Sequence, residues 1–297
     1  MNKNKINLLK SKTMNNIIVG LGEILWDIFS DQKVLGGAPA NFAYHVSQQG
    51  YKGYIVSSIG NDEFGSEIIS LLKDKNLNYI IDINDYPTGV VNIKLNSYGE
   101  PQYEIVEDVA WENMLFTKEM EDLARKTSAV CFGTLAQRSL LSHNTINKFL
   151  NTVPENCIKI FDINLRQNFY SKSIIQGSLE KADILKLNDH EINVMAELYN
   201  MKEMKEQEIC LKLKDLFSLE IVILTKGTNG SFIFSNNEIS FLHTPKVNVV
   251  DTVGAGDAFT AAFITSYLKG KPIKEAHKSA VEVSAFVCRQ QGAMPKF

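Results

Sequence analysis

Short apolar runs rich in isoleucine and valine recur along the chain, and longer segments with helical spacing follow them. Six of these runs are predicted strands, at residues 16–22, 53–60, 128–134, 158–164, 183–188 and 220–227. Apolar strands that alternate with helices are typical of a sheet that is covered on both faces. The pattern therefore predicts an α/β fold with a mainly parallel central sheet and helices on both sides of it.

Polar residues and glycines stand at or just beyond the ends of several strand-like segments. They are Glu23, Asp27, Gly133, Asp162, Asn164, Asn188 and Lys226. Open α/β sheets bind their ligands beyond the carboxyl ends of the strands. We therefore expect the functional site at this edge of the sheet.

Two segments have patterns of their own. Residues 39–50 are predicted to form a helix, because Pro39 suits a first helical turn and Gly50 suits a C-terminal stop. Residues 88–108 alternate apolar and polar positions on either side of a turn-forming segment at 97–101, which predicts an antiparallel hairpin. An insertion of this kind is a candidate lid over a binding site.

No internal repeat or proline-rich linker divides the chain. We therefore expect one domain over residues 14–297, with the hairpin inserted into it. Residues 1–13 are polar and rich in lysine, so we expect a disordered N-terminal extension there.

The bulk composition narrows the possible partners. The formal net charge of −3 gives no reason to expect the basic surface that nucleic-acid binding requires. The four cysteines lie far apart, which indicates neither a zinc site nor a disulfide framework. Glu23 interrupts the early apolar residues before a signal or membrane segment could form. We expect a cytoplasmic protein that binds neither nucleic acid nor membrane.

The run from Asp251 to Asp257 has the residue types that phosphoryl transfer needs. Gly254, Ala255 and Gly256 have little or no side chain, and the helical pattern after them places their N–H groups at a positive helix end, where a phosphate binds. Asp257 would lie in the first turn as the catalytic base, and the helix dipole there should lower its pKa. The structural alternative is a tight glycine turn with a capping aspartate.

Residues 251–259 resemble the C-terminal signature of the PfkB, or ribokinase-type, carbohydrate kinases. Four other segments resemble motifs of that family in the same order, at 36–43, 60–65, 188–191 and 225–230. The resemblance implies a ribokinase-like fold with a small β-sheet lid, and an ATP-dependent sugar kinase with Mg²⁺ as cofactor. It also makes a homodimer plausible, because lids in this family often pair between subunits.

The resemblance also implies roles for individual residues. Asp257 would take the proton of the acceptor hydroxyl, while the N–H groups of Gly254, Ala255 and Gly256 stabilise the transferring phosphoryl group. The implied sugar-binding residues are Asp27, Gly36, Gly37, Asn41, Asn164 and Arg166. Carboxylates and amides suit hydroxyl recognition, although the two adjacent glycines could form only a turn.

The implied nucleotide-binding residues are Asn188, Glu191, Thr225, Lys226, Gly227, Gly230 and Gly292. Glu191 would organise Mg²⁺ through water, and Asp251 could contribute to a site for a monovalent cation such as K⁺. Without the resemblance, Glu191 would be an ordinary acid at a helix start and Lys226 a surface lysine.

The segments 22–27, 111–113, 132–138 and 161–166 resemble bacterial fructokinases within this family. This implies that the substrate is fructose and the product fructose 6-phosphate. A 2-keto-3-deoxygluconate kinase or another ketose kinase stays open, because Arg166 also suits a substrate carboxylate. Two other functional classes stay open. One is a non-catalytic sugar or nucleotide sensor on the same fold. The other is a dinucleotide-dependent oxidoreductase, although the segment after the first strand lacks the third glycine of the dinucleotide-binding G-x-G-x-x-G motif.

Overall fold

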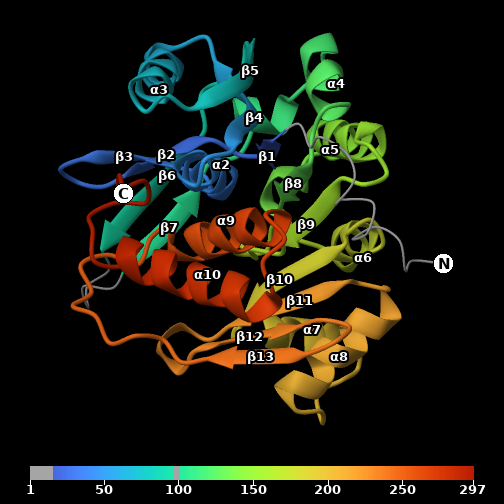
Figure 1. The fold of residues 1–297 in the computed structure, drawn as a ribbon. Coiled ribbons are helices and arrows are strands. Elements are labelled where there is room, and N and C mark those ends of the chain that lie inside the picture. Colours follow the sequence, from blue (N-terminus) through green and yellow to red (C-terminus); the bar gives the residue numbers. More distant parts are fainter. Residues whose placement is uncertain (1–15, 96–100) are drawn as a thin grey trace.

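The computed structural model describes residues 16–95 and 101–297, and its centre is a large twisted sheet (Figure 1). The strands of this sheet are β1 (Ile17–Leu21), β4 (Lys52–Gly60), β5 (Asn78–Asn84), β8 (Ala129–Phe132), β9 (Ile158–Asp162), β10 (Ile184–Asn188), β11 (Ile221–Thr225), β12 (Ser231–Phe234) and β13 (Ile239–Leu242). Their order is β13-β12-β11-β10-β9-β8-β1-β4-β5. The strands from β11 to β5 in this order are parallel, and β12 and β13 pair antiparallel at one edge.

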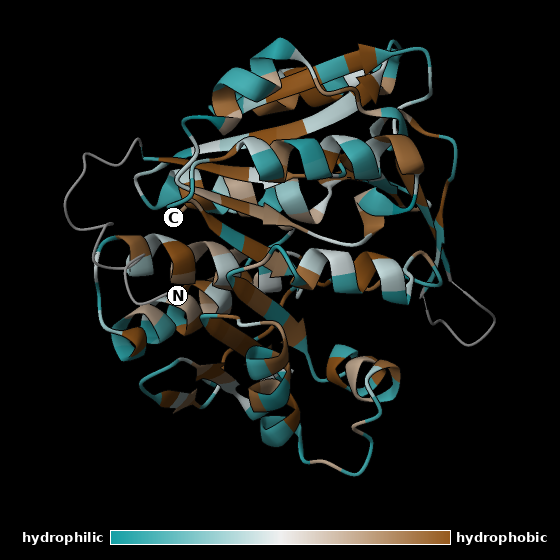
Figure 2. Ribbon diagram, turned by 90° about the vertical axis from the view of Figure 1, so that its right-hand side faces the viewer, coloured by the Kyte–Doolittle hydropathy of each residue, from teal (hydrophilic) through white to brown (hydrophobic). Residues whose placement is uncertain are grey.

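Helices cover both faces of the sheet, as predicted. One face carries α2 (Ala38–Gln48), α3 (Glu63–Asp74), α9 (Ala255–Leu268) and α10 (Ile273–Val287). The other carries α4 (Lys118–Ala124), α5 (Leu140–Thr152), α6 (Lys172–Leu179), α7 (Glu191–Leu198) and α8 (Glu206–Leu216). Apolar strands lie between helices that are striped with hydrophilic residues, which explains the alternating pattern along the sequence (Figure 2).

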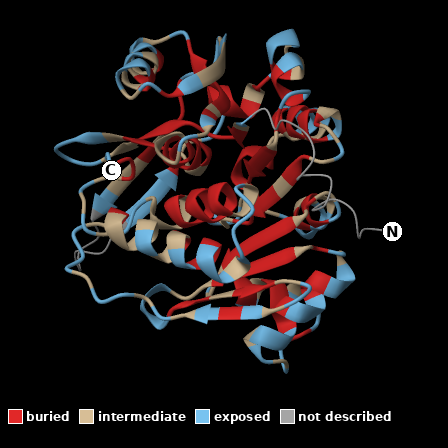
Figure 3. Cartoon of the chain, viewed as in Figure 1, coloured by how far each residue is buried: buried red, intermediate tan, exposed pale blue. Residues whose placement is uncertain are grey.

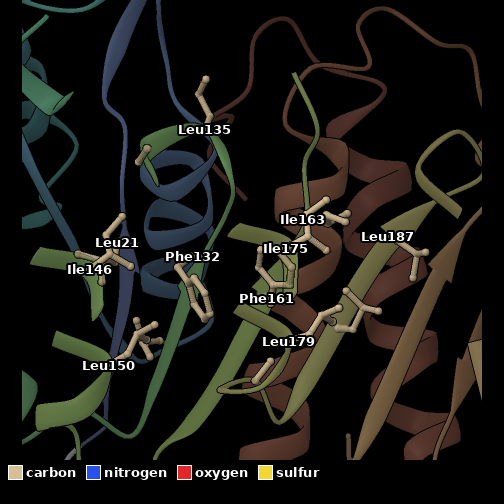
Figure 4. Close-up of a cluster of buried hydrophobic side chains, with 14 of the residues drawn as sticks. Leu21, Phe132, Leu135, Ile146, Leu150, Phe161, Ile163, Ile175, Leu179 and Leu187 are labelled. Atoms are coloured by element: carbon tan, nitrogen blue, oxygen red, sulfur yellow. The ribbon is translucent and has the colours of Figure 1, made fainter. Parts of the chain in front are cut away.

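Side chains that alternate along the strands pack into separate cores on the two faces. On one face Phe132 of β8 stacks on Phe161 of β9, with their ring centroids 5.4 Å apart. Ile146 of α5 and Ile175 of α6 belong to the same cluster (Figure 4). This packing fixes the neighbouring strands β8 and β9, whose carboxyl ends lead into the site.

Helix α9 is the most deeply enclosed helix of the site. All its residues from Ala258 to Ser266 are buried, between the sheet, α2 and α10 (Figure 3). Burial on every side explains why its sequence is apolar all round rather than on one stripe. The helix therefore holds its N-terminal residues in a fixed place.

A second sheet, here called the lid sheet, contains β3 (Lys33–Gly36), β2 (Leu25–Ile28), β6 (Val90–Leu95) and β7 (Pro101–Ile105), in that order. Strands β6 and β7 pair antiparallel where the sequence predicted a hairpin. The predicted turn at 97–101 lies mostly outside the described residues. The participation of β2 and β3 was not predicted from the sequence.

The predicted fold class is confirmed, and all six predicted strands belong to the central sheet. The predicted helix at 39–50 is α2. Strands β5, β12 and β13 were not predicted. Residues 1–13, where a disordered extension was expected, lie outside the described part of the chain. Within residues 16–95 and 101–297 no helix is long and apolar enough to span a membrane.

Candidate active site

The carboxyl ends of adjacent parallel strands and the start of α9 enclose a small pocket. Glu23 lies just after β1, Gly133 just after β8, and Asp162 and Asn164 at the end of β9. Asp257, in the first turn of α9, completes this group of lining residues. The site therefore lies at the edge of the sheet where the sequence placed it.

Gly254 precedes α9 and adopts a left-handed conformation with φ 75°. A Cβ atom on Gly254 would lie 2.7 Å from the side chain of Ala293, so both the backbone angle and the available space require glycine. The first N–H groups of a helix have no partner within the helix. The N–H group of Ala255 donates to the carbonyl oxygen of Thr252 over 3.3 Å in this structure. The turn from Gly254 to Gly256 still presents the positive end of the helix to an anion.

Asn41 and Asp257 connect the two helices of the site. Asn41 Nδ2 of α2 donates a hydrogen bond of 2.9 Å to Asp257 Oδ2 of α9. Asn41 Oδ1 is buried and has no hydrogen-bond partner among the described residues. Since the amide N–H group faces the carboxylate, the amide oxygen is left to accept a hydrogen bond from a ligand.

The expectation that the pKa of Asp257 is lowered was wrong. Burial raises the pKa of this carboxyl to about 6, and the negative charge of Asp162 adds to the rise. The hydrogen bond from Asn41 and the charge of Lys186 oppose the rise without cancelling it. The sequence showed the helix start but not the depth of burial, which is the larger effect here.

Lys186 is a site residue that the sequence analysis missed. It is 6% exposed, and its Nζ forms an ion pair of 3.0 Å with Asp162 Oδ1 on the neighbouring strand. Burial alone would lower the pKa of this lysine, but attraction to Asp162 and nearby carboxylates raises it overall. A Cβ atom on Gly256 would lie 3.3 Å from Nζ, so a fixed positive charge adjoins the glycine turn. A lysine inside an otherwise apolar strand was the signal for it.

Of the predicted sugar-binding residues, Asn164 lines the pocket and Asn41 bonds the pocket residue Asp257. Gly36 packs against Asp27, because a Cβ atom on Gly36 would lie 2.5 Å from Asp27 Oδ2. Gly37 caps α2 with φ 106°. Burial raises the pKa of Asp27 to about 6, against the opposing charge of Arg166. Arg166 itself is exposed and forms no ion pair with Glu23, Asp27 or Asp257, although its positive charge lowers the pKa of all three.

Asn188 and Glu191 lie where β10 leads into α7. Glu191 is 4% exposed, and its two oxygens accept the N–H groups of Leu165 at 2.9 Å and of Asn188 at 2.8 Å. Because each oxygen keeps a further lone pair, this carboxylate suits a Mg²⁺ ion that is held mainly by water and phosphate oxygens. In the described residues no three His, Cys, Asp or Glu side chains gather as a metal site. The role of Glu191 stays a prediction.

The predicted nucleotide residues follow β11. Thr225 ends this strand, and Gly227 begins a short 3₁₀ turn that ends before Gly230. Lys226 Nζ forms an ion pair of 2.5 Å with Glu206 of α8. This pair is partly exposed, so a phosphate could replace Glu206 as the partner of Lys226 at low cost.

Asp251 connects the segment before α9 to the C-terminal segment. Its carboxylate accepts hydrogen bonds of 3.0 Å from the N–H groups of Val253 and Gly292. These hydrogen bonds join the two segments, and the nucleotide-binding role of Gly292 stays a prediction. A monovalent-cation site here stays a prediction.

Comparison with known proteins identifies the family of this chain. Residues 14–296 match the model of the pfkB family of carbohydrate kinases. The chain is 28% identical to an uncharacterized sugar kinase of Pyrococcus horikoshii over 93% of this chain and 91% of the relative. It is 27% identical to an ATP-dependent 6-phosphofructokinase of Thermoanaerobacterium thermosaccharolyticum, over 93% and 89% of the two chains.

Solved structures show the same architecture. The structure of the Pyrococcus horikoshii sugar kinase in complex with ATP has a TM-score of 0.76 and 26% identity, over 94% of each chain. A fructokinase of Xylella fastidiosa with bound ATP has a TM-score of 0.83 over 95% of this chain and 94% of that one, and at 18% identity it supports the fold alone. By the family match over nearly its whole length, the chain belongs to the pfkB family of carbohydrate kinases.

Proposed function

We propose that this sugar kinase transfers the γ-phosphoryl group of ATP to a hydroxyl of a small neutral sugar, with fructose as the preferred acceptor and fructose 6-phosphate as the product. The observation that carries the proposal is the position of Asp257. Its carboxylate lies beside the glycine turn at the start of α9 and is oriented by Asn41. A base and an anion site therefore adjoin each other.

In the proposed step, the sugar hydroxyl oxygen forms a bond to the γ-phosphorus while the bond to the bridging oxygen of ADP breaks. The hydroxyl proton passes to Asp257 Oδ1 or Oδ2 as the new bond forms. A pKa of about 6 leaves Asp257 mostly ionised near neutral pH and makes it a better proton acceptor than an ordinary aspartate. Mg²⁺ would neutralise part of the phosphate charge when bound.

The negative charge of the transferring group would meet two stabilising features. The N–H groups from Gly254 to Gly256 would donate to its oxygens, and Lys186 would supply a fixed positive charge beside them. Because Lys186 is already held by Asp162, its ammonium group need not reorganise during the reaction. On the other side, the segment after β11 would hold the nucleotide, with Thr225, Lys226, Gly227 and Gly230 as the contacts.

The charge around the acceptor pocket favours a neutral sugar. Asp257 lines the pocket and Asp27 packs against Gly36, so two ionisable aspartates belong to the proposed acceptor side. Arg166, whose positive charge acts on both aspartates, is exposed. A substrate carboxylate or phosphate would meet net repulsion there. A sugar hydroxyl can donate to a carboxylate or to Asn41 Oδ1, which lacks a partner in the described structure.

This proposal is tested by measuring ADP release with fructose, tagatose, ribose, adenosine, 2-keto-3-deoxygluconate and fructose 6-phosphate as acceptors. We expect the highest kcat/KM with fructose and the lowest values with the two anionic sugars. A higher kcat/KM with 2-keto-3-deoxygluconate would instead assign Arg166 to its carboxylate. Binding of a sugar without turnover of any acceptor would favour the sensor class and contradict the proposal.

A further inference from the structure

Glu23 has no place in the reaction as described so far, yet it lines the same pocket as Asp257. It lies two residues after the end of β1 and is 3% exposed. Its Oε2 atom is buried, and the described part of the chain offers it no hydrogen-bond partner. A buried polar atom without a partner costs free energy, so its presence at a binding pocket suggests that a ligand completes it.

Backbone N–H groups lie beside the carboxyl group of Glu23. It accepts hydrogen bonds from its own backbone N–H group and from that of Ala38, the first residue of α2. The backbone of Gly37 passes so close that a Cβ atom there would lie 2.5 Å from the carbonyl oxygen of Glu23. The contact with Gly37 therefore fixes the backbone at Glu23, while Oε2 of the side chain has no partner among the described residues.

The titratable groups around Glu23 disfavour a second negative charge. The pocket also contains Asp257 of α9, Asp162 of β9 and Cys131 of β8, which are acidic or neutral. Lys186 is engaged by Asp162. Asp27 of β2 is a further acidic group, and the positive charge of Arg166 acts on it. Arg166 is exposed, so solvent screens its charge. Helix α2 offers backbone N–H groups and the Asn41 amide.

Burial raises the pKa of Glu23 to about 7, and the charge of Asp257 adds to the rise. The N–H groups and Arg166 oppose it only in part. A protonated carboxyl group turns Oε2 from an acceptor into a hydrogen-bond donor.

We propose that Glu23 acts as a neutral carboxylic acid in the sugar pocket and donates a hydrogen bond from Oε2 to an oxygen of the bound sugar, while Asp257 stays ionised and accepts the proton of the reacting hydroxyl. The inference rests on the proposed kinase reaction. It gives the pocket a donor next to its acceptors, which matches a polyol, since every sugar hydroxyl can both donate and accept.

The two carboxyl groups then have opposite requirements. Activity rises with pH as Asp257 ionises, through a pKa of about 6, and falls as Glu23 loses its proton, through a pKa of about 7. The expected pH profile of kcat/KM for the sugar is therefore bell-shaped, and the fall on its alkaline side is caused by the deprotonation of Glu23.

Glu23→Gln and Glu23→Leu test the role, because Gln copies the shape and donor of a neutral carboxyl group and Leu removes the donor. We expect Glu23→Gln to keep kcat/KM within about threefold of the unmodified enzyme at pH 6 and to lose the alkaline fall. Glu23→Leu should lose roughly tenfold or more, mainly in KM for the sugar, because a substrate oxygen loses its donor. Glu112→Gln, in a buried carboxyl group outside the pocket, should leave the shape of the pH profile unchanged.

Infrared difference spectroscopy gives a readout that does not depend on turnover. At pH 6 the carboxyl groups of Asp27 and Asp257 are also partly protonated, because burial raises the pKa of each to about 6. The signal of Glu23 is therefore the C=O band that the unmodified protein shows at pH 6 and that Glu23→Gln lacks. The inference is overturned if the band is absent, if folded Glu23→Gln loses most of its activity at pH 6, or if its alkaline fall persists. Failure of the proposed function would appear differently, as no turnover of any sugar by the unmodified enzyme.

Discussion

Asn41 Nδ2 donates to Asp257 Oδ2 over 2.9 Å, and this hydrogen bond joins the first turn of α2 to the first turn of α9. Helix α2 begins directly after Gly36 and Gly37, which are proposed to bind the sugar. Helix α9 begins at the glycine turn that is proposed to bind the phosphate. The bond therefore fixes the proposed base between the two substrates. It also stabilises the ionised form of Asp257, because it is donated to the carboxylate.

Replacing Asn41 with Ala should lower kcat/KM by roughly 10- to 100-fold, because the base loses its orienting donor and the sugar loses an acceptor. The loss of the donor should also raise the pKa of Asp257 further, so the acid side of the pH profile should shift to higher pH. Steady-state kinetics between pH 5 and pH 8 measure both effects. An unshifted acid side would show that the bond does not act on the base.

Asp257→Asn should lower kcat by about 10²- to 10⁴-fold, the range that general-base catalysis contributes. The affinity for ATP should stay near normal, because the amide keeps the shape of the side chain and the proposed nucleotide contacts lie at and after the end of β11. Calorimetric titration with ATP and the ADP-release assay check these two points. Retention of full activity would show that Asp257 is not the proton acceptor.

The same substitution should stabilise the fold above neutral pH. The pKa of Asp257 in the folded state is raised to about 6, so the folded state favours the protonated form. Its contribution to stability is therefore complete below the usual aspartate pKa and is lost as pH rises through about 6. At pH 8 the ionised carboxylate is a cost, and Asp257→Asn should raise the free energy of unfolding by about 1–2 kcal/mol. Thermal unfolding should show a gain at pH 8 that shrinks at pH 5.

The sequence predicted the parallel strands, α2 and the glycine turn well, because each follows from local pattern. Short or non-local elements were harder to predict. Strands β2 and β3 have four residues each and pair with one another, and β2 joins the sheet through β6, which lies far away in the sequence. The pKa of Asp257 was predicted in the wrong direction, since burial by chain segments far apart in sequence outweighs the local helix dipole. Lys186 was missed because it can be buried as a charged group only through its ion pair with Asp162, which lies on the neighbouring strand.

The pair of Lys186 and Asp162 should separate stability from catalysis. Lys186→Met leaves Asp162 buried without its cation, which should cost about 3–5 kcal/mol of stability. Adding Asp162→Asn should restore much of this stability. Turnover should stay reduced by roughly 10²-fold in the double variant, because the positive charge beside Gly256 is still missing.

Thermal unfolding and kcat of the two single variants and the double variant measure this separation. Lys202→Met is a matched control, because Lys202 pairs with Glu197 on the surface and should contribute less than about 1 kcal/mol. A double variant that regains full turnover would restrict Lys186 to a structural role.

Gln167 connects the lid sheet to the rest of the site. Its Nε2 donates a hydrogen bond of 2.5 Å to the carbonyl oxygen of Tyr103 on β7. Gln167 itself is exposed, and it lies in the loop after β9 that also carries Arg166. Gln167→Ala should therefore leave the thermal midpoint nearly unchanged, but it should raise KM for the sugar by about 2- to 10-fold, the worth of one hydrogen bond.

A looser lid should also admit water to the phosphoryl group, so ADP release should exceed the formation of sugar phosphate in this variant. Gln176→Ala is the control, because Gln176 is an exposed glutamine whose amide bonds Glu180 within the α6 region, away from the lid. Equal KM values in the two variants would show that the lid does not depend on Gln167. A raised KM together with a matching loss of thermal stability would instead show that the contact supports the fold of the loop and not closure over the sugar.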